Sequence, residues 1–235
     1  MKYDSCKKHN NNKKYSHKKS HSTFNMNPHF IAPNPVTSFN TRSVRPNLDP
    51  TAYVCPFSSI IGDVTIKKNV FIAPSVSVRA DEGFPIYIDE HSNLQDGVIL
   101  HGLEHRTIDI GDDDVSIYIG KRVSCAHGSI IHGPCSIGDG TFIGFNAIIL
   151  DAIIGKGCFI SINAVVTGGV TIPNNRFVPT GAIIDTQQKA NALREVTEEE
   201  EEFARDVIFV NREFPEAYSK LFGATKNSCV LKCNK

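Results

Sequence analysis

Three histidines lie close together along the chain, at His101, His127 and His132. Two of them directly follow an aliphatic residue, since His101 comes after Leu100 and His132 after Ile131. Neutral imidazoles are common ligands of divalent metals, and three of them leave one position of a tetrahedral ion open for water. A metal ion lowers the pKa of such a water to about 7. The histidines therefore predict a metal site that makes water nucleophilic at neutral pH.

The histidines lie in a stretch where aliphatic residues, with one cysteine, recur every six positions. This register comprises Ile60, Ile66, Ile72, Val78, Ile88, Leu94, Leu100, Ile119, Cys125, Ile131, Ile137, Ile143, Ile149, Ile154, Ile160, Val166, Ile172, Val178 and Ile184. A small or β-branched residue usually follows four positions later, and this two-slot hexapeptide is typical of a parallel β-helix. Three hexapeptides make one triangular coil of about 18 residues. We expect an all-β solenoid of about six to seven coils.

The repeat register also places the polar residues relative to one another. Arg79, His101 and His132 follow aliphatic residues that are one full coil apart, so we expect them to form a column on one outer face. Gln95 and His127 are likewise one coil apart, but on the preceding face. We infer that a neighbouring subunit brings His127 to the column. This predicts a homotrimer with intersubunit sites.

The charges of the chain are distributed unevenly. There are 25 Lys and Arg residues against 25 Asp and Glu residues, but residues 1–22 carry seven Lys and one Asp. This +6 tail has little to bury, so we expect it to be disordered and able to dock onto an acidic surface or a larger assembly. The remaining net charge of −6 does not favour nucleic acid as a partner of the body. No stretch is apolar enough for a membrane span or a secretory signal, so we expect a cytoplasmic protein.

These patterns predict four segments. They are a disordered Lys-, His- and Asn-rich tail (1–24), a β-helix (25–185), a helical segment (186–224) and a flexible C-terminal tail (225–235). In the helical segment, the acidic run from Glu198 to Glu202 precedes apolar residues at three- and four-residue steps. This pattern indicates one amphipathic helix that packs along the β-helix, with its acids at the favourable amino end.

The cysteines of the chain fall into two groups. Cys125, Cys135 and Cys158 occupy repeat positions and are expected in the core, because free cysteine is readily buried. Cys229 and Cys233 are spaced like half of a metal or redox site, but we interpret them as part of a frayed terminus.

The motifs around these residues resemble those of γ-class carbonic anhydrases. They are SVRADEGFPIYIDEHSNLQDGVILHGLE, SCAHGSIIHGP and GVTIPNNRFVPTGAII, and the similarity extends from about residue 30 to residue 222. The resemblance implies a left-handed, trimeric β-helix with a C-terminal helix along it. It also implies reversible hydration of carbon dioxide to bicarbonate by a metal-bound hydroxide. Zinc is the default metal, and ferrous iron or cobalt would also accept three imidazoles and water.

The resemblance assigns roles to individual residues. His101, His127 and His132 match the metal ligands, and Arg79 with Asp81 matches an intersubunit ion pair, for which we favour a structural role. The other matched residues are Gln95, which would hydrogen-bond the hydroxide, its polar neighbour Asn93, the active-site carboxylate Glu82, the proton shuttle Glu104, and Asn211, which would orient carbon dioxide.

The chain departs from the family pattern in two places. Phe209 replaces a tyrosine, and the loop from His105 to Ser116 is shorter and poorer in glutamate.

Two other functional classes stay open at this point. A catalytically weak or silent scaffold would form the trimer and bind metal without hydrating carbon dioxide. A hexapeptide acyltransferase would use one histidine and a coenzyme A groove, and its activity would survive chelation of metals.

Overall fold

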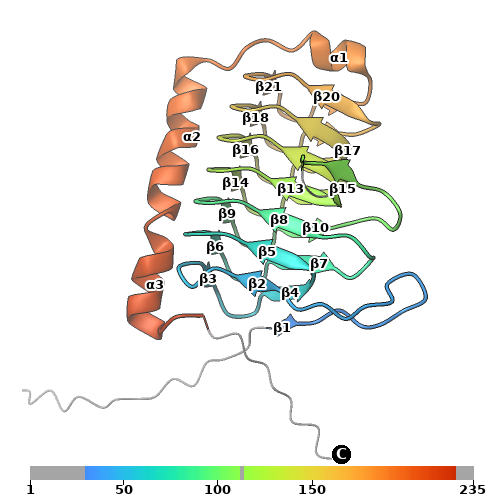
Figure 1. Ribbon diagram of the computed structural model, residues 1–235. Helices are drawn as coiled ribbons and strands as arrows, with labels where there is room; N and C mark the ends of the chain where they lie inside the picture. Colours follow the sequence, from blue (N-terminus) through green and yellow to red (C-terminus); the bar gives the residue numbers. More distant parts are fainter. Residues whose placement is uncertain (1–29, 112–113, 226–235) are drawn as a thin grey trace, which may run out of the picture.

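The computed structural model describes residues 30–111 and 114–225. A parallel β-solenoid forms most of this part, and three helices follow it (Figure 1). The tail predicted at 1–24, Cys229, Cys233 and nearly all of the predicted C-terminal tail lie outside the described residues.

The strands follow one another around three faces of the solenoid. The first face consists of β1 (Phe30–Ala32), β4 (Ser59–Gly62), β7 (Ser77–Ala80), β10 (Ile99–His101), β15 (Ile130–Ile137), β17 (Ile148–Ile154), β19 (Val165–Val166) and β22 (Ile183–Ile184). The second consists of β2 (Asn47–Leu48), β5 (Val64–Ile66), β8 (Ile86–Ile88), β13 (Ile117–Ile119), the later halves of β15 and β17, and β20 (Val170–Ile172). The third consists of β3 (Tyr53–Val54), β6 (Phe71–Ile72), β9 (Asn93–Leu94), β14 (Ser124–Cys125), β16 (Phe142–Ile143), β18 (Phe159–Ile160) and β21 (Phe177–Val178).

The solenoid has about eight coils rather than the six to seven expected from the sequence. The expected count began at Ile60, whereas β1, β2 and β3 precede that residue. Strand β1 pairs with β4 in the register Phe30 to Ser59, outside the hexapeptide spacing. Leu48 of β2 and Val54 of β3 keep the six-residue spacing and pair with Ile66 and Ile72, so the expected count began one coil too late and only β1 lies outside the repeat.

The aliphatic residues of the register point inward and fill the prism. Leu100 and Ile131, which precede two of the histidines, have no exposed surface. Cys125, Cys135 and Cys158 are buried among them, as predicted. Burial disfavours a thiolate and raises the pKa of Cys135 to about 12, so this side chain stays a neutral thiol at physiological pH.

Three helices end the described chain: α1 (Gln187–Asn191), α2 (Glu198–Asn211) and α3 (Phe214–Phe222). The last two run along the third face (Figure 1). The predicted C-terminal helix along the solenoid is present but is divided into two, because Pro215 lacks a backbone N–H and cannot continue α2. The predicted acidic start is confirmed, since Thr197 and Glu200 form a capping box at the amino end of α2. No helix in the described segments is long and apolar enough to cross a lipid bilayer.

Aromatic rings attach the two long helices to the solenoid. Phe203 of α2 packs edge-on against Phe142, with ring centroids 5.4 Å apart. Lower down, Phe214 and Tyr218 of α3 lie 5.1 and 5.6 Å from Phe71 on β6. These contacts fix α2 beside the strands that carry the third-face polar residues.

An ion pair at the start of α2 predicts a pH-dependent stability. Arg194 donates two hydrogen bonds to Glu200, at 2.9 and 2.6 Å. These bonds are the main cause that lowers the pKa of Glu200 to about 2 in the folded protein. Because the folded pKa lies below the unfolded one, the ionised pair stabilises the fold above about pH 4.5 and loses that contribution as the pH falls to about 2. Thermal unfolding should show Glu200→Gln less stable than the wild type at pH 7, with the gap closing towards pH 2.

The exposed neighbour Glu199 provides the matched control, because Glu199→Gln removes the same charge from the same helix turn. We expect this variant to change the unfolding temperature much less. A gap between Glu200→Gln and the wild type that is equally large at pH 7 and pH 2 would contradict the role given to the ion pair.

Candidate metal centre

The backbone register confirms the predicted column on the first face. His101 pairs with Arg79 on one side and with His132 on the other, as Cα partners on neighbouring strands. The rings of His101 and His132 are edge-on, with centroids 5.2 Å apart. The Nδ1 atom of His101 lies 3.3 Å from the Nε2 atom of His132. Adjacent coils therefore bring two imidazole nitrogens face to face.

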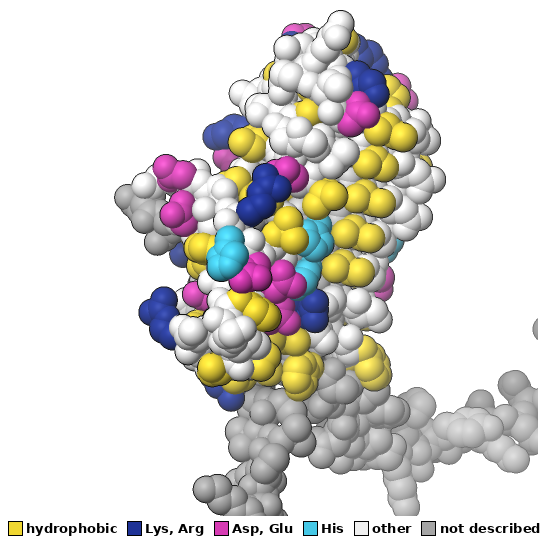
Figure 2. All heavy atoms as spheres, turned by 90° about the vertical axis from the view of Figure 1, so that its right-hand side faces the viewer, with side chains coloured by type: hydrophobic (Ala, Val, Ile, Leu, Met, Phe, Trp, Pro, Cys, Tyr) yellow, Lys and Arg dark blue, Asp and Glu magenta, His cyan; other side chains and the backbone are white. Residues whose placement is uncertain are grey.

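Charged side chains surround the outer nitrogen of His101. Its Nε2 atom lies 2.9 Å from an Nη atom of Arg79, 3.2 Å from a carboxylate oxygen of Asp81 and 3.3 Å from one of Glu82. Arg79 also lies 3.5 Å from Asp81 within the same chain. Figure 2 shows histidine, acidic and basic side chains gathered on this face of the molecule. The pairing of Arg79 and Asp81 across an interface stays a prediction.

His127 lies on the third face, away from this column. Its ring stacks on Phe145 with centroids 5.6 Å apart, and its Nδ1 atom lies 3.1 Å from a carboxylate oxygen of Asp96. It lines a cavity of about 600 Å³ that Gln95 and Asn211 also line. The cavity lies between the solenoid and the last two helices. Asn211 of α2 and His127 of the solenoid therefore line the same cavity.

The amide groups on the third face form a connected chain. Gln95 donates from Nε2 to Asn93 at 3.2 Å, and Asn93 donates from Nδ2 to the hydroxyl of Ser124 at 2.8 Å. All three residues are buried. Asn211 is also buried and donates to the carbonyl of Val207 in α2. These bonds hold the two amide side chains that line the cavity, Gln95 and Asn211, in fixed orientations.

One chain does not bring the three histidines together. Within residues 30–111 and 114–225, no three His, Cys, Asp or Glu side chains converge as a possible metal site. His101 and His132 are two of the three predicted ligands and lie side by side, whereas His127 lies on a different face. The donor chemistry nevertheless fits a divalent metal, because imidazole nitrogens suit zinc, iron and cobalt alike. Within the part of the chain that the structure describes, the column therefore supplies two of the three imidazoles of the predicted metal site.

An apolar stripe runs beside the histidine column on the first face. Its residues are consecutive Cα partners that all point outward: Ile99, Ile130, Ile148, Val165 and Ile183. Ile99, Ile148 and Ile183 are between 37% and 56% exposed. Figure 2 shows rows of hydrophobic side chains next to the histidines. A contiguous exposed apolar surface of this kind is typical of interaction sites.

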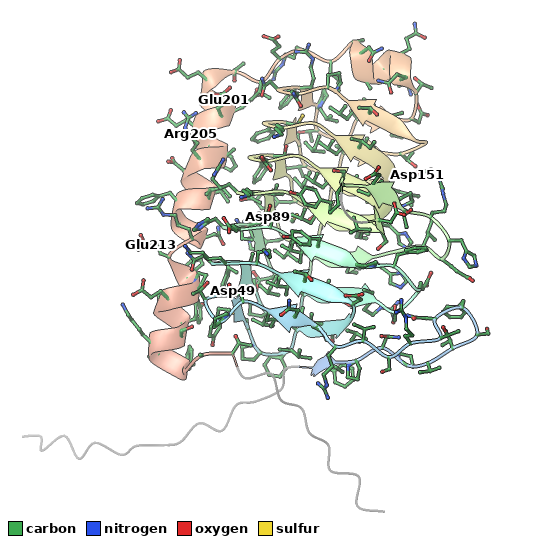
Figure 3. The ribbon with its side chains drawn as sticks, in the orientation of Figure 1. Asp49, Asp89, Asp151, Glu201, Arg205 and Glu213 are labelled. Atoms are coloured by element: carbon green, nitrogen blue, oxygen red, sulfur yellow. The ribbon has the colours of Figure 1, made fainter. Side chains whose placement is uncertain are left out.

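The loop after β10 carries Glu104, and the structure shows two contacts there that the periodicity did not reveal. Glu104 and His105 form a pair, with an oxygen of Glu104 2.5 Å from the Nε2 atom of His105. Arg106 donates two hydrogen bonds to Asp151 of β17, at 2.9 and 3.0 Å. Figure 3 labels Asp151 at the edge of the solenoid beside this loop. The loop is anchored to the solenoid directly after His105.

Two further supporting residues escaped the sequence reasoning. Cys135 donates from its thiol to the carbonyl oxygen of His132 at 3.0 Å and so ties down the strand that presents this histidine. Asp96 holds one ring nitrogen of His127, and a carboxylate in that position orients a ligating histidine. Cys135 lies three residues from its histidine, whereas Asp96 lies one coil before His127, so the repeat register was the signal that could have found Asp96.

Comparison with known proteins gives the following relatives. No protein-family model matches the chain. The chain is 39% identical over 202 residues to a carbonic anhydrase from Methanosarcina thermophila, and the match covers 81% of each protein. It is 41% identical over 186 residues to the carboxysome assembly protein CcmM of Nostoc, a match that spans 78% of this chain but 33% of that protein. Among solved structures, a hexapeptide transferase family protein from Anaplasma phagocytophilum superposes with a TM-score of 0.61 at 25% identity, covering 74% of this chain and 93% of the other.

Proposed function

The chain belongs to the γ-class carbonic anhydrase family of left-handed β-helices, and from this membership we propose that it reversibly hydrates carbon dioxide to bicarbonate. The reaction takes place at a metal held by His101 and His132 of one subunit and His127 of its neighbour in a homotrimer. The observation that carries this proposal is the pairing of His101 with His132 on adjacent strands while His127 lies on another face.

Zinc is the default occupant of this centre, with ferrous iron or cobalt as alternatives. When bound, such a metal supplies Lewis acidity, which lowers the pKa of water to about 7 and makes a nucleophile available at neutral pH. The neighbouring carboxylates of Asp81 and Glu82 add negative charge beside His101 and so favour a cation there.

The buried amides orient the reactants. Because the Nε2 group of Gln95 donates to Asn93, its oxygen can accept a hydrogen bond from the attacking water. The bond from Asn93 to Ser124 keeps this pair in place. Asn211 lines the same cavity among apolar rings, where its amide is suited to position carbon dioxide, a small molecule with little polarity. Holding both reactants at a fixed orientation lowers the entropic part of the barrier.

Two carboxylates near the site have different roles, and one of them handles the proton that hydration releases. Glu82 lies next to His101 and forms part of the polar wall of the site. Glu104 is 41% exposed on the neighbouring loop, so its carboxylate can take a proton from the site and reach solvent. Since a net proton leaves in every hydration cycle, this transfer must recur at each turnover.

The trimer interface completes the site. We assign Arg79 and Asp81 to holding this interface by their opposite charges, in preference to a direct part in the chemistry. The apolar stripe from Ile99 to Ile183 runs beside them, and its burial against a second copy would stabilise the assembly by about 25 cal/mol for each Å² of apolar surface.

A catalytically silent scaffold is the alternative that one comparison favours. The Nostoc relative is a carboxysome assembly protein, of which the chain spans 33%. If this chain has only such a role, it will form the trimer and bind metal but will not accelerate hydration. A hexapeptide acyltransferase, the other alternative, would keep its activity after chelation and in a His101→Ala variant.

Removal of the metal tests the proposed function. We expect dialysis against a strong chelator to abolish carbon dioxide hydration, and stoichiometric zinc, ferrous iron or cobalt to restore it. The reason is that three imidazoles alone do not make water nucleophilic at neutral pH. Metal content per chain and hydration rate should be measured on the same samples. Full activity in metal-free protein would exclude the proposed site, and a reloaded but inactive trimer would establish the scaffold.

A further inference from the structure

Glu104 is paired with a second group that can carry a proton. We propose that His105 accepts the proton collected by Glu104 and passes it to buffer, so that the proton leaves the site through two side chains in succession. This inference rests on the proposed function and deepens it. His105 would act through Glu104, without touching the substrate or the metal.

The geometry of the pair supports a transfer between the two side chains. An oxygen of Glu104 lies 2.5 Å from the Nε2 atom of His105, so the two groups are in direct contact and no water molecule is needed between them. The side chain of Glu104 is 41% exposed, whereas that of His105 is 77% exposed. A proton that moves from Glu104 to His105 thus passes from a partly covered carboxylate to an imidazole that buffer molecules can reach freely.

The surrounding loop holds the pair in place. Arg106, the next residue, is bound by two hydrogen bonds to Asp151 of β17. The antiparallel pair β11 (Ile108–Asp109) and β12 (Asp114–Val115) follows within the loop. His105 itself has a φ of 60°, in the left-handed region that is uncommon for residues other than glycine.

The proposed step balances in protons and leaves no group permanently changed. Glu104 in its acid form gives its proton to the Nε2 atom of His105, which becomes an imidazolium while Glu104 returns to the carboxylate. The imidazolium then loses one proton to a buffer base. Imidazole is suited to this role because it both accepts and releases protons between about pH 5 and pH 8. Glu104 is then free for the next cycle.

A single substitution separates proton exit from the chemistry of hydration. In His105→Asn, asparagine tolerates the left-handed backbone but cannot carry a proton. We expect kcat at low buffer concentration to fall on the order of tenfold, with kcat/KM unchanged, because proton transfer out of the site limits kcat alone. Added imidazole buffer should restore kcat. His91, with a φ of 61° on another part of the solenoid, provides the control, and His91→Asn should behave as the wild type.

Each other outcome overturns the relay. If His105→Asn keeps the wild-type kcat at low buffer, Glu104 delivers its proton to solvent unaided, and the proposed function stands without the relay. If kcat and kcat/KM fall together and imidazole does not restore them, His105 has a structural role. If the metal-loaded wild type shows no hydration at all, the proposed function fails and the relay with it.

Discussion

Replacing His101 with alanine is expected to abolish carbon dioxide hydration while leaving the solenoid folded. His101 is central to the column, since its two ring nitrogens face His132 on one side and Arg79, Asp81 and Glu82 on the other. Loss of a residue that merely orients a metal ligand costs about 10- to 100-fold in affinity or activity. Removal of the ligand itself should therefore lower kcat/KM by more than about 100-fold.

The fold should survive this change because the His101 side chain points outward, and the inward contacts of the strand come from Leu100. Circular dichroism and thermal unfolding should match those of the wild type, while metal content per chain falls. His91→Ala removes a histidine elsewhere and should retain both metal and activity. Hydration at the wild-type rate by a folded His101→Ala protein would exclude this histidine as a ligand.

Mixing two inactive variants is expected to restore activity. His101→Ala lacks one half of each site, and His127→Ala lacks the other. If the halves come from different subunits, a trimer that contains both variants has an interface where an intact His101 and His132 meet an intact His127. In an equal, random mixture each half is intact in half of the subunits, so about one quarter of the wild-type activity should return.

Two controls make the mixing experiment decisive. Mixing His101→Ala with His132→Ala should restore nothing, because these residues are Cα partners in the same chain and belong to the same half-site. Mixing the His101→Ala and His127→Ala proteins under conditions in which trimers do not exchange subunits should also give no activity. If the His101→Ala and His127→Ala mixture stays inactive after verified exchange, all three ligands must come from one subunit, and the intersubunit site is wrong.

The hexapeptide register predicted the fold and the histidine column because both depend on local periodicity. In a solenoid each coil repeats the path of the one before, so a residue's place in the repeat fixes its face and its neighbours one coil away. The pairing of Arg79 with His101 and of His101 with His132 follows from this rule. The same rule put Gln95 and His127 on another face.

Features outside the repeat could not be predicted in this way. The pairing of β1 with β4 lies outside the hexapeptide spacing, and the break between α2 and α3 depends on the single residue Pro215. The ion pair between Arg106 and Asp151 joins a loop to a strand 45 residues later, and no period relates the two positions. Such contacts depend on the path of an irregular loop, which side-chain spacing does not encode.

The rate of carbon dioxide hydration by the metal-loaded wild type tests the central claim most directly. Protein purified without oxygen and loaded with zinc or ferrous iron should be compared with buffer alone by stopped-flow, with its mass measured by light scattering in the same preparation. We predict a trimer that accelerates hydration well above the buffer rate in at least one metal form. A trimer with full metal content and no rate above buffer in either form would contradict the enzyme assignment, and a monomer would contradict the intersubunit site.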